Sequence, residues 1–264
     1  MALLFKFLSA HHHYNRQIQV DDIRMTFDSC DSVEERAKLL LFKIFNTQSQ
    51  PKLDEMKQFF CKIEGCPDSL RSLEAFSEFL THSLPQKDGQ SKTTSDLFEK
   101  LNNVGGWGPK TAALFLRNLA LIKQTQDLHG KFWSDIDCFD VKTIRLPVDK
   151  VILSIFSKLT VSVEDPTLRL KDFESINTYL KNGDHSPNDI VVWDDLWFWG
   201  YVTQKVVKNE RDVLFSATSK KMSPDRSHVW NASKYWSIFT APKNSTHIAE
   251  IKRLAEDEFL PLLK

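Results

Sequence analysis

Apolar residues recur at helical spacing along most of the chain. The clearest run covers residues 33–45, where an apolar stripe follows Ser32 at the position of a helix N-cap. Similar patterns predict helices over residues 52–62, 69–80, 168–180 and 247–263. The chain has only 8 glycines in 264 residues, which is few for a protein rich in turns. The pattern therefore favours a mainly α protein.

Two of the helical runs are joined by a short glycine-rich segment. Residues 104–112 read Val-Gly-Gly-Trp-Gly-Pro-Lys-Thr-Ala, and an Ala- and Leu-rich run continues to residue 122. Pro109 suits the first turn of a helix, and the glycines permit a sharp turn before it. Ser95 or Asp96 can cap the helix that precedes the turn. The segment predicts a helix, a tight hairpin and a second helix, whose free N–H groups and positive dipole end form an anion site.

Lys110 lies in the first turn of that second helix. The positive end of the helix dipole and partial burial both favour the neutral amine, which is a nucleophile. The same position also suits a lysine that pairs with a phosphate or a surface carboxylate. The spacing alone leaves both interpretations open.

A second segment, Leu146-Pro147-Val148-Asp149, precedes an apolar helical pattern over residues 151–159. Pro147 disfavours helix at Leu146, so Asp149 stands where the new helix begins. A carboxylate at that position accepts hydrogen bonds from the free N–H groups of the helix and stays ionised. Taken alone, Asp149 is an N-cap.

Two aromatic segments are expected to contribute to the core. Residues 123–145 contain Phe132, Trp133 and Phe139, which a disordered insert would rarely hold, so part of this connection should pack. Residues 194–201 form the densest aromatic patch, and most of it should be buried because Trp and Phe bury the largest apolar areas.

The charge balance narrows the possible functions. Lys and Arg together number 35, as do Asp and Glu, which argues against a general nucleic-acid coat protein. It is compatible with a DNA enzyme that confines its positive charge to one groove. The four scattered cysteines form no Cys-x-x-Cys pair, and residues 1–8 are too short for a membrane span and lack the features of a secretory signal. We expect a monomer in the cytoplasm with reduced thiols, no membrane association and no metal site.

Together, the hairpin and the Pro-Val-Asp segment resemble the helix-hairpin-helix base-excision DNA glycosylase superfamily. Its members carry a hairpin of the form Leu-Pro-Gly-Val-Gly-x-Lys-Thr-Ala and, downstream, Val-Asp at a helix start. The resemblance covers residues 101–159. Lys110 falls on the Schiff-base lysine of the bifunctional members, and Asp149 falls on the catalytic aspartate.

The chain departs from the common form of the family in three places. Gly105 replaces the usual proline, Trp107 replaces the usual aliphatic residue, and the connection from Lys110 to Asp149 is longer than in most members. The archaeal oxoguanine DNA glycosylase branch also has a lengthened connection and a Pro-Val-Asp signature, so this branch is the closest likeness.

The resemblance implies a two-lobed helical fold with a DNA-binding groove between the lobes. Residues 1–264 would form a single catalytic unit. Residues 46–123 would make one lobe that ends in the hairpin, and residues 1–45 together with 147–264 would make the other.

The resemblance also implies a set of DNA contacts. The hairpin would contribute Gly106, Gly108 and Thr111, and we expect a Cβ at either glycine to spoil the backbone conformation or the approach of a phosphate. Gln48 follows an apolar helix, where many members insert a glutamine into the DNA; a helix-end glutamine without that role is an equal alternative. The expected base pocket includes three further residues, Leu114, Trp133 and Trp230.

The activity implied is that of a bifunctional glycosylase and AP lyase acting on double-stranded DNA that contains a damaged base, with 8-oxoguanine as the expected lesion. One alternative is a non-catalytic helix-hairpin-helix module, in which Lys110 contacts phosphate and Asp149 is an N-cap. Another is a monofunctional glycosylase that uses Asp149 and water. The resemblance implies no required cofactor beyond an alkali ion on the hairpin carbonyls. No iron–sulfur cluster is expected, because no cysteine follows Cys138.

Overall fold

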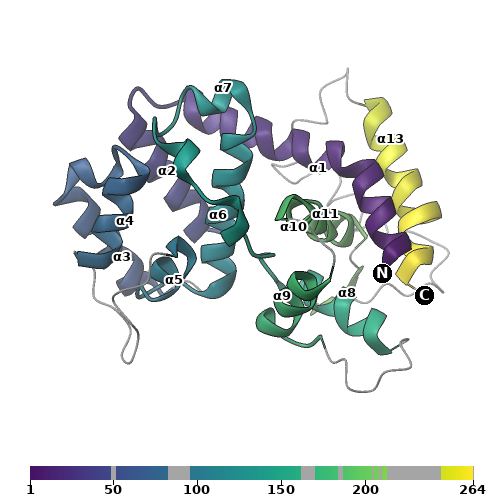
Figure 1. The fold of residues 1–264 in the computed structure, drawn as a ribbon. Helices are drawn as coiled ribbons and strands as arrows, with labels where there is room; N and C mark the ends of the chain where they lie inside the picture. The colour runs from purple at the N-terminus through teal and green to yellow at the C-terminus, as the bar shows by residue number, and fades with distance from the viewer. Residues whose placement is uncertain are drawn as a thin grey trace. The chain divides into compact units, whose positions relative to one another are not determined.

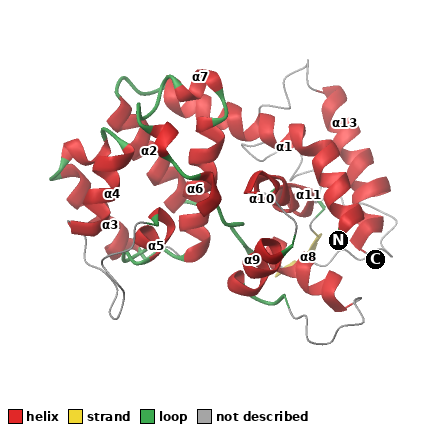
Figure 2. Cartoon of the chain, viewed as in Figure 1, coloured by secondary structure: helices red, strands yellow, loops and turns green. Residues whose placement is uncertain are grey.

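The chain is mainly helical, as the apolar spacing predicts, and Figure 2 shows the helices of the computed structural model. The structure describes residues 1–48, 52–82, 96–161, 170–183, 187–203, 205–207, 210–212 and 245–263. Strands within these ranges are limited to one antiparallel ribbon of β1 (Lys205–Val207) and β2 (Glu210–Asp212), in which Val206 pairs with Arg211. Searching the same ranges finds no helix with both the length and the apolar character that a membrane crossing needs.

The chain divides into two compact units. Unit 1 comprises residues Met1–Ile18 and Val148–Lys264, and unit 2 comprises Gln19–Pro147. Helix α1 (Ala2–Asp28) begins in unit 1 and ends in unit 2. The other helices of unit 2 are α2 (Val33–Phe45), α3 (Leu53–Glu64), η1 (Pro67–Leu70), α4 (Leu73–His82), α5 (Leu97–Asn102), α6 (Pro109–Lys123), α7 (Gln126–His129), η2 (Ile136–Cys138) and η3 (Val141–Thr143), most of which are labelled in Figure 1.

Helix α2 has the bounds that the sequence predicts. The Ser32 hydroxyl accepts a hydrogen bond from the Glu35 N–H at 3.1 Å, which satisfies one of the free donors at the helix start. The predicted stripe, including Leu40, Leu41 and Ile44, is buried. It packs against α6 and η1, so α2 belongs to the same unit as the hairpin.

The boundaries of unit 2 differ from the expected lobe of residues 46–123 at both ends. Residues 19–45 belong to unit 2, because α2 packs on α6. Residues 124–147 also belong to it, because the aromatic residues of the connection pack inside: Phe132, Trp133 and Phe139 are all buried. The prediction that this connection packs is therefore confirmed.

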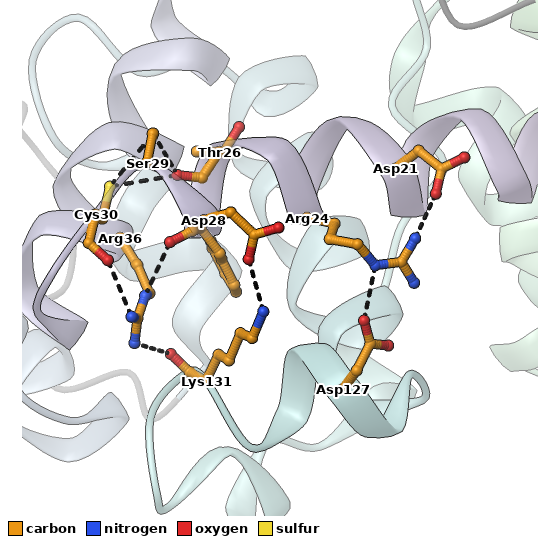
Figure 3. A network of polar contacts seen from close by, with 10 residues as sticks. Asp21, Arg24, Thr26, Asp28, Ser29, Cys30, Arg36, Asp127 and Lys131 are labelled. Carbon is orange, nitrogen blue, oxygen red and sulfur yellow. Dashed lines mark hydrogen bonds and ion pairs between the residues drawn. The ribbon is translucent and has the colours of Figure 1, made fainter.

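Polar contacts hold the end of α1 within unit 2 (Figure 3). Arg24 Nε donates to Asp127 at 2.8 Å, and Lys131 Nζ donates to Asp28 at 2.6 Å. Arg36, at the start of α2, donates to the carbonyl of Lys131 at 3.0 Å. Exposed ion pairs contribute little stability individually. These contacts link the end of α1 and the start of α2 to α7 and to the residues just after it.

Unit 1 is built around an aromatic core. Its helices, besides the first part of α1, are α8 (Lys150–Val161), α9 (Phe173–Asn182), α10 (Pro187–Trp193), α11 (Asp195–Val202), α13 (Ser245–Leu254), the π-helical turn η5 (Ala255–Phe259) and η6 (Leu260–Leu263). Trp193 and Trp199 are fully buried, and Phe7 of α1 lies edge-on to Trp199 at 5.0 Å between ring centroids. Phe259 packs on Phe7 at 5.6 Å, and Figure 1 shows α13 alongside the first part of α1. Most of the patch at residues 194–201 is core, as predicted.

Helices α8 and α11 approach closely at a glycine. A Cβ built on Gly200 would lie 2.3 Å from Val151 Cγ1 and 3.0 Å from Ile155 Cδ1. Only a residue without a side chain fits this contact, so Gly200 sets the spacing of the two helices. Helix α8 begins directly after Asp149, and its packing on α11 thereby fixes the place of Asp149 in unit 1.

Candidate functional site

Helix α5, helix α6 and the turn between them form the predicted helix-hairpin-helix. Asp96 caps α5, with its Oδ1 accepting from the Phe98 N–H at 2.9 Å. The chain then turns through two backbone hydrogen bonds, from Val104 N–H to the Leu101 carbonyl at 3.0 Å and from Trp107 N–H to the Val104 carbonyl at 3.2 Å. Helix α6 begins at Pro109, the position that the sequence assigns to it.

The two glycines assigned to DNA contact have different backbone conformations. Gly106 has φ 83°, in the left-handed region that favours glycine. Gly108 has φ −129° and ψ 171°, which any residue adopts, and a Cβ built there meets nothing within 4 Å. The backbone conformation therefore requires glycine at position 106 and not at position 108. Only the close approach of another molecule would make a Cβ unfavourable at Gly108.

Trp107 anchors the hairpin in the core of unit 2. Its side chain is only 2% exposed. The ring lies 4.8 Å from Phe45 of α2, 5.7 Å from Phe59 of α3 and 6.0 Å from Phe115 of α6, all measured between centroids. An aliphatic residue would fill less of this space. The departure from the family pattern at position 107 therefore has a packing reason.

Gln48 also contacts the hairpin. Its Nε2 donates a hydrogen bond to the Gly106 carbonyl at 3.2 Å, and the side chain is half-buried. Gln48 and Gly106 are 58 residues apart in the sequence. No local pattern indicates this contact, because it depends on how α2 and the hairpin pack against each other.

The first turn of α6 offers backbone N–H groups. Gly108 has no side chain to cap the helix, Pro109 has no N–H, and the first intrahelical bond runs from Ala112 N–H to the Gly108 carbonyl at 2.9 Å. The N–H groups of Lys110 and Thr111 consequently have no acceptor within the helix. Thr111 is only 4% exposed over the whole residue, so its hydroxyl is largely closed to an outside partner. The arrangement suits an anion.

Lys110 is half-buried in the same turn. Its amino group has no hydrogen bond or ion pair with any residue that the structure describes. Leu114, four residues further along α6, lies on the same face and is also half-buried. Leu114 therefore remains a candidate for a pocket near the Lys110 amine.

Asp149 is the N-cap that its position predicts. Its Oδ1 accepts hydrogen bonds from the N–H groups of Val151 and Ile152, both at 2.9 Å. These two donors hold the half-buried carboxylate in one orientation at the start of α8. Asp149 belongs to unit 1 and Lys110 to unit 2.

The structure gives Trp133 a structural role. The ring is fully buried against Phe76 and Phe132, at 5.6 and 4.6 Å between centroids, and its Nε1 donates to the Leu70 carbonyl at 2.7 Å. A ring with no exposed surface has nothing to offer a base, so we assign Trp133 to the core of unit 2. Trp230, the other tryptophan expected in the base pocket, lies outside the described residues.

The neighbouring Asp135 is a helix cap that sequence reasoning missed. Its two carboxylate oxygens accept from the N–H groups of Leu73 and Glu74 at 2.8 and 2.9 Å, at the start of α4. The cap comes from a residue that follows α4 by more than fifty positions, so no spacing rule indicates it.

A pocket of about 610 Å³ lies on the α3 side of the hairpin. Glu55 and Phe59 line it together with Val104 and Gly105. Neither Lys110 nor Leu114 is among the described residues that line it. This pocket is therefore separate from the turn that carries the candidate nucleophile.

The hairpin carbonyls fit only in part the alkali ion that the resemblance implies. The Val104 carbonyl accepts from the Trp107 N–H and keeps a second lone pair, whereas the Leu101 carbonyl accepts from the N–H groups of both Asn103 and Val104. The Gly106 carbonyl already accepts from Gln48. The Val104 and Gly106 oxygens, which each keep a lone pair, would hold the ion, which would supply positive charge near the start of α6.

Unit 1 contains a buried carboxylate that sequence reasoning did not single out. Asp195 is fully buried; it accepts a hydrogen bond from Asn15 Nδ2 at 2.7 Å and shares a second hydrogen bond with His12 Nδ1 at 2.8 Å. Burial raises the pKa of Asp195 to about 7, although the hydrogen bond and charge of His12 act in the opposite direction. The charge of Asp194 raises it further.

Because burial raises the pKa of Asp195, we expect its contribution to the stability of the fold to fall as the pH rises. An unfolded aspartate ionises near pH 4, whereas folded Asp195 keeps its proton to about pH 7, so the free energy of unfolding decreases between these values. We expect Asp195→Asn to remove that decrease, which is on the order of 1–4 kcal/mol. Thermal midpoints from pH 4 to 8 measure it, with the exposed Asp31→Asn as control. Parallel profiles for wild type and Asp195→Asn would contradict the prediction.

Comparison with known proteins adds no assignment. No protein-family model, no curated protein and no solved structure matches the chain.

Proposed function

We propose that the chain is a DNA repair glycosylase with AP-lyase activity. It flips a damaged base out of double-stranded DNA and excises it through a Schiff base on Lys110, acting as a monomer, with 8-oxoguanine as the expected base. The observation that carries the proposal is the first turn of α6. There a half-buried lysine without a described partner stands beside two backbone N–H groups that have no acceptor within the helix.

The hairpin supplies the contact with the DNA backbone in this proposal. A base inside a duplex is out of reach of any side-chain nucleophile, so the nucleotide must leave the stack. The N–H groups of Lys110 and Thr111 bind a phosphate beside the lesion, with the helix dipole adding to the attraction. Backbone groups suit this task because binding through them costs no side-chain entropy.

Lys110 and Asp149 supply the chemistry. The neutral amine of Lys110 attacks C1′ of the flipped nucleotide, and the bond from C1′ to the base breaks, with the electron pair leaving on the base. The amine gives up two protons, one to the departing base and one to the ring oxygen O4′, as the sugar ring opens to give an imine between Lys110 and C1′. Asp149 stabilises the positive charge that grows at C1′ and assists deprotonation of the lysine. Loss of a proton from C2′ then forms a C2′–C3′ double bond and breaks the bond between C3′ and its oxygen, which leaves with the 3′ phosphate. Water finally hydrolyses the imine and releases the lysine as a free amine.

One observation favours the alternative of a non-catalytic DNA-binding module. The Oδ1 of Asp149 is engaged by two N–H groups of α8, as in any capped helix, so capping alone accounts for this aspartate. A module would use the start of α6 to bind phosphate and would need no reaction at Lys110.

Borohydride trapping tests the proposed function directly. The wild-type chain is incubated with duplexes that each hold one damaged base or an abasic site, with and without borohydride, and with an undamaged duplex of the same sequence as control. Borohydride reduces an imine to a permanent bond between protein and DNA. We expect trapping and strand nicking on the abasic duplex and on the duplex with 8-oxoguanine, and neither on the control.

The other possible results of the borohydride experiment would each support a different function or none. Binding without trapping or nicking would support the DNA-binding module. Base release without trapping would support a monofunctional glycosylase that uses Asp149 and water. A chain that binds none of the duplexes would overturn the reading as a DNA-acting protein.

A further inference from the structure

The peptide unit between Gly106 and Trp107 is hydrogen-bonded at both of its ends, a feature that the proposed function does not use. Its N–H belongs to Trp107 and donates to the Val104 carbonyl at 3.2 Å. Its carbonyl belongs to Gly106 and accepts from Gln48 Nε2, also at 3.2 Å. Because a peptide unit is planar, bonds at both of its ends fix the orientation of the whole plane.

The residues around this peptide leave it little room. A Cβ built on Gly106 would lie 3.3 Å from Glu55 Cβ and 3.5 Å from Phe45 Cε1, so the peptide lies between α2 and α3. Phe45, three residues before Gln48, also packs against Trp107 at 4.8 Å between centroids. The last turn of α2 and the residues just after it thus contact the hairpin twice, once through an aromatic ring and once through an amide.

From this geometry we infer that Gln48 is a positioning residue for the hairpin, instead of a residue that enters the DNA. Its amide locks the Gly106–Trp107 plane, which lies immediately before Gly108 and the first turn of α6. A change in ψ of Gly106 that φ of Trp107 does not compensate would turn the start of α6 and so redirect the N–H groups of Lys110 and Thr111. With the plane locked, these donors keep their direction before any anion arrives.

The inference has two parts that can fail separately. The lock on the hairpin is a property of the free chain and needs no DNA. Its effect on DNA rests on the proposed function, because only an anion bound at α6 would sense the direction of the N–H groups.

The test uses Gln48→Met, which keeps the length of the side chain and removes its donor. Asn46→Ala is the matched control, since Asn46 is exposed just before Gln48 in the same turn. Amide hydrogen exchange is measured on the free chain. We expect the Trp107 amide to exchange faster by roughly threefold to tenfold, the factor that one ordinary hydrogen bond contributes, while Leu116 and Leu119 inside α6 are unchanged. Unchanged exchange at Trp107 would overturn the inference.

A second measurement separates positioning from insertion into the DNA. Affinity is measured for an abasic duplex and for a single strand of the same sequence, which has no gap to fill. A positioning residue predicts that Gln48→Met weakens both by a similar factor of about three to ten. Weakening confined to the duplex, with normal exchange in the free chain, would assign Gln48 to insertion. If the wild-type chain bound neither the duplex nor the single strand, this result would count against the proposed function. The hydrogen-exchange result on the free chain would still stand.

Discussion

Replacing Lys110 by glutamine is expected to abolish borohydride trapping and strand nicking while leaving DNA binding largely intact. The imine needs a primary amine, which glutamine lacks. Phosphate binding is expected to survive because it comes mainly from the backbone N–H groups at the start of α6, which the substitution does not remove. The measurements are the trapped fraction on an abasic duplex and the affinity for the same duplex.

Two further variants make this prediction specific. Lys110→Arg keeps a positive charge for phosphate but forms no imine under these conditions, so it should bind at least as well as Lys110→Gln and remain untrapped. Lys150 is an exposed lysine in the first turn of α8, and Lys150→Gln should be trapped like the wild-type chain. If Lys110→Gln is still trapped, the nucleophile is another amine and the site assignment is wrong.

Asp149→Asn is expected to slow base excision by at least about 10²-fold without unfolding the chain, if the loss of negative charge near C1′ costs as much as in other enzymes. Asparagine caps helices about as well as aspartate, and its side-chain oxygen can still accept from Val151 and Ile152. Single-turnover excision rates and thermal midpoints measure the two effects separately.

The chain offers a close control for this substitution. Asp172 caps α9, where its Oδ1 accepts from the Ser175 N–H at 2.7 Å. Asp172→Asn makes the same chemical change at another helix start and should leave the excision rate unchanged. An excision rate for Asp149→Asn within a few-fold of the wild-type rate would reduce Asp149 to a cap and favour the DNA-binding module.

The sequence predicts well those features that depend on near neighbours. Ser32 and Asp149 are both N-caps, and Pro109 opens α6, because capping and the start of a helix involve residues two to four positions apart. The bounds of α2 follow from its own apolar period. Gly106 is identified as a turn glycine from the motif itself, and its φ is positive.

The sequence is less informative where a residue type has several uses. Trp133 suits a base pocket as well as a core, and only its burial and its bond to the Leu70 carbonyl assign it to the core. Gly108 belongs to the same motif as Gly106, yet its backbone conformation is an ordinary extended one. A motif names the residues that recur together, but it does not state which physical requirement each of them meets.

Spacing along the chain was thus enough to predict a mainly helical protein, a helix-hairpin-helix that starts at Ser95 or Asp96, and a helix that begins at Asp149. Only the packing of the helices shows that Gln48 binds the Gly106 carbonyl, that Asp135 caps α4, and that α2 belongs with the hairpin. It likewise decided that Asp195 is buried against His12, 183 residues away. The physical reason is that a local hydrogen bond is set by the spacing of residues along one helix. A contact between distant residues depends on how whole helices pack, which no short stretch of sequence encodes.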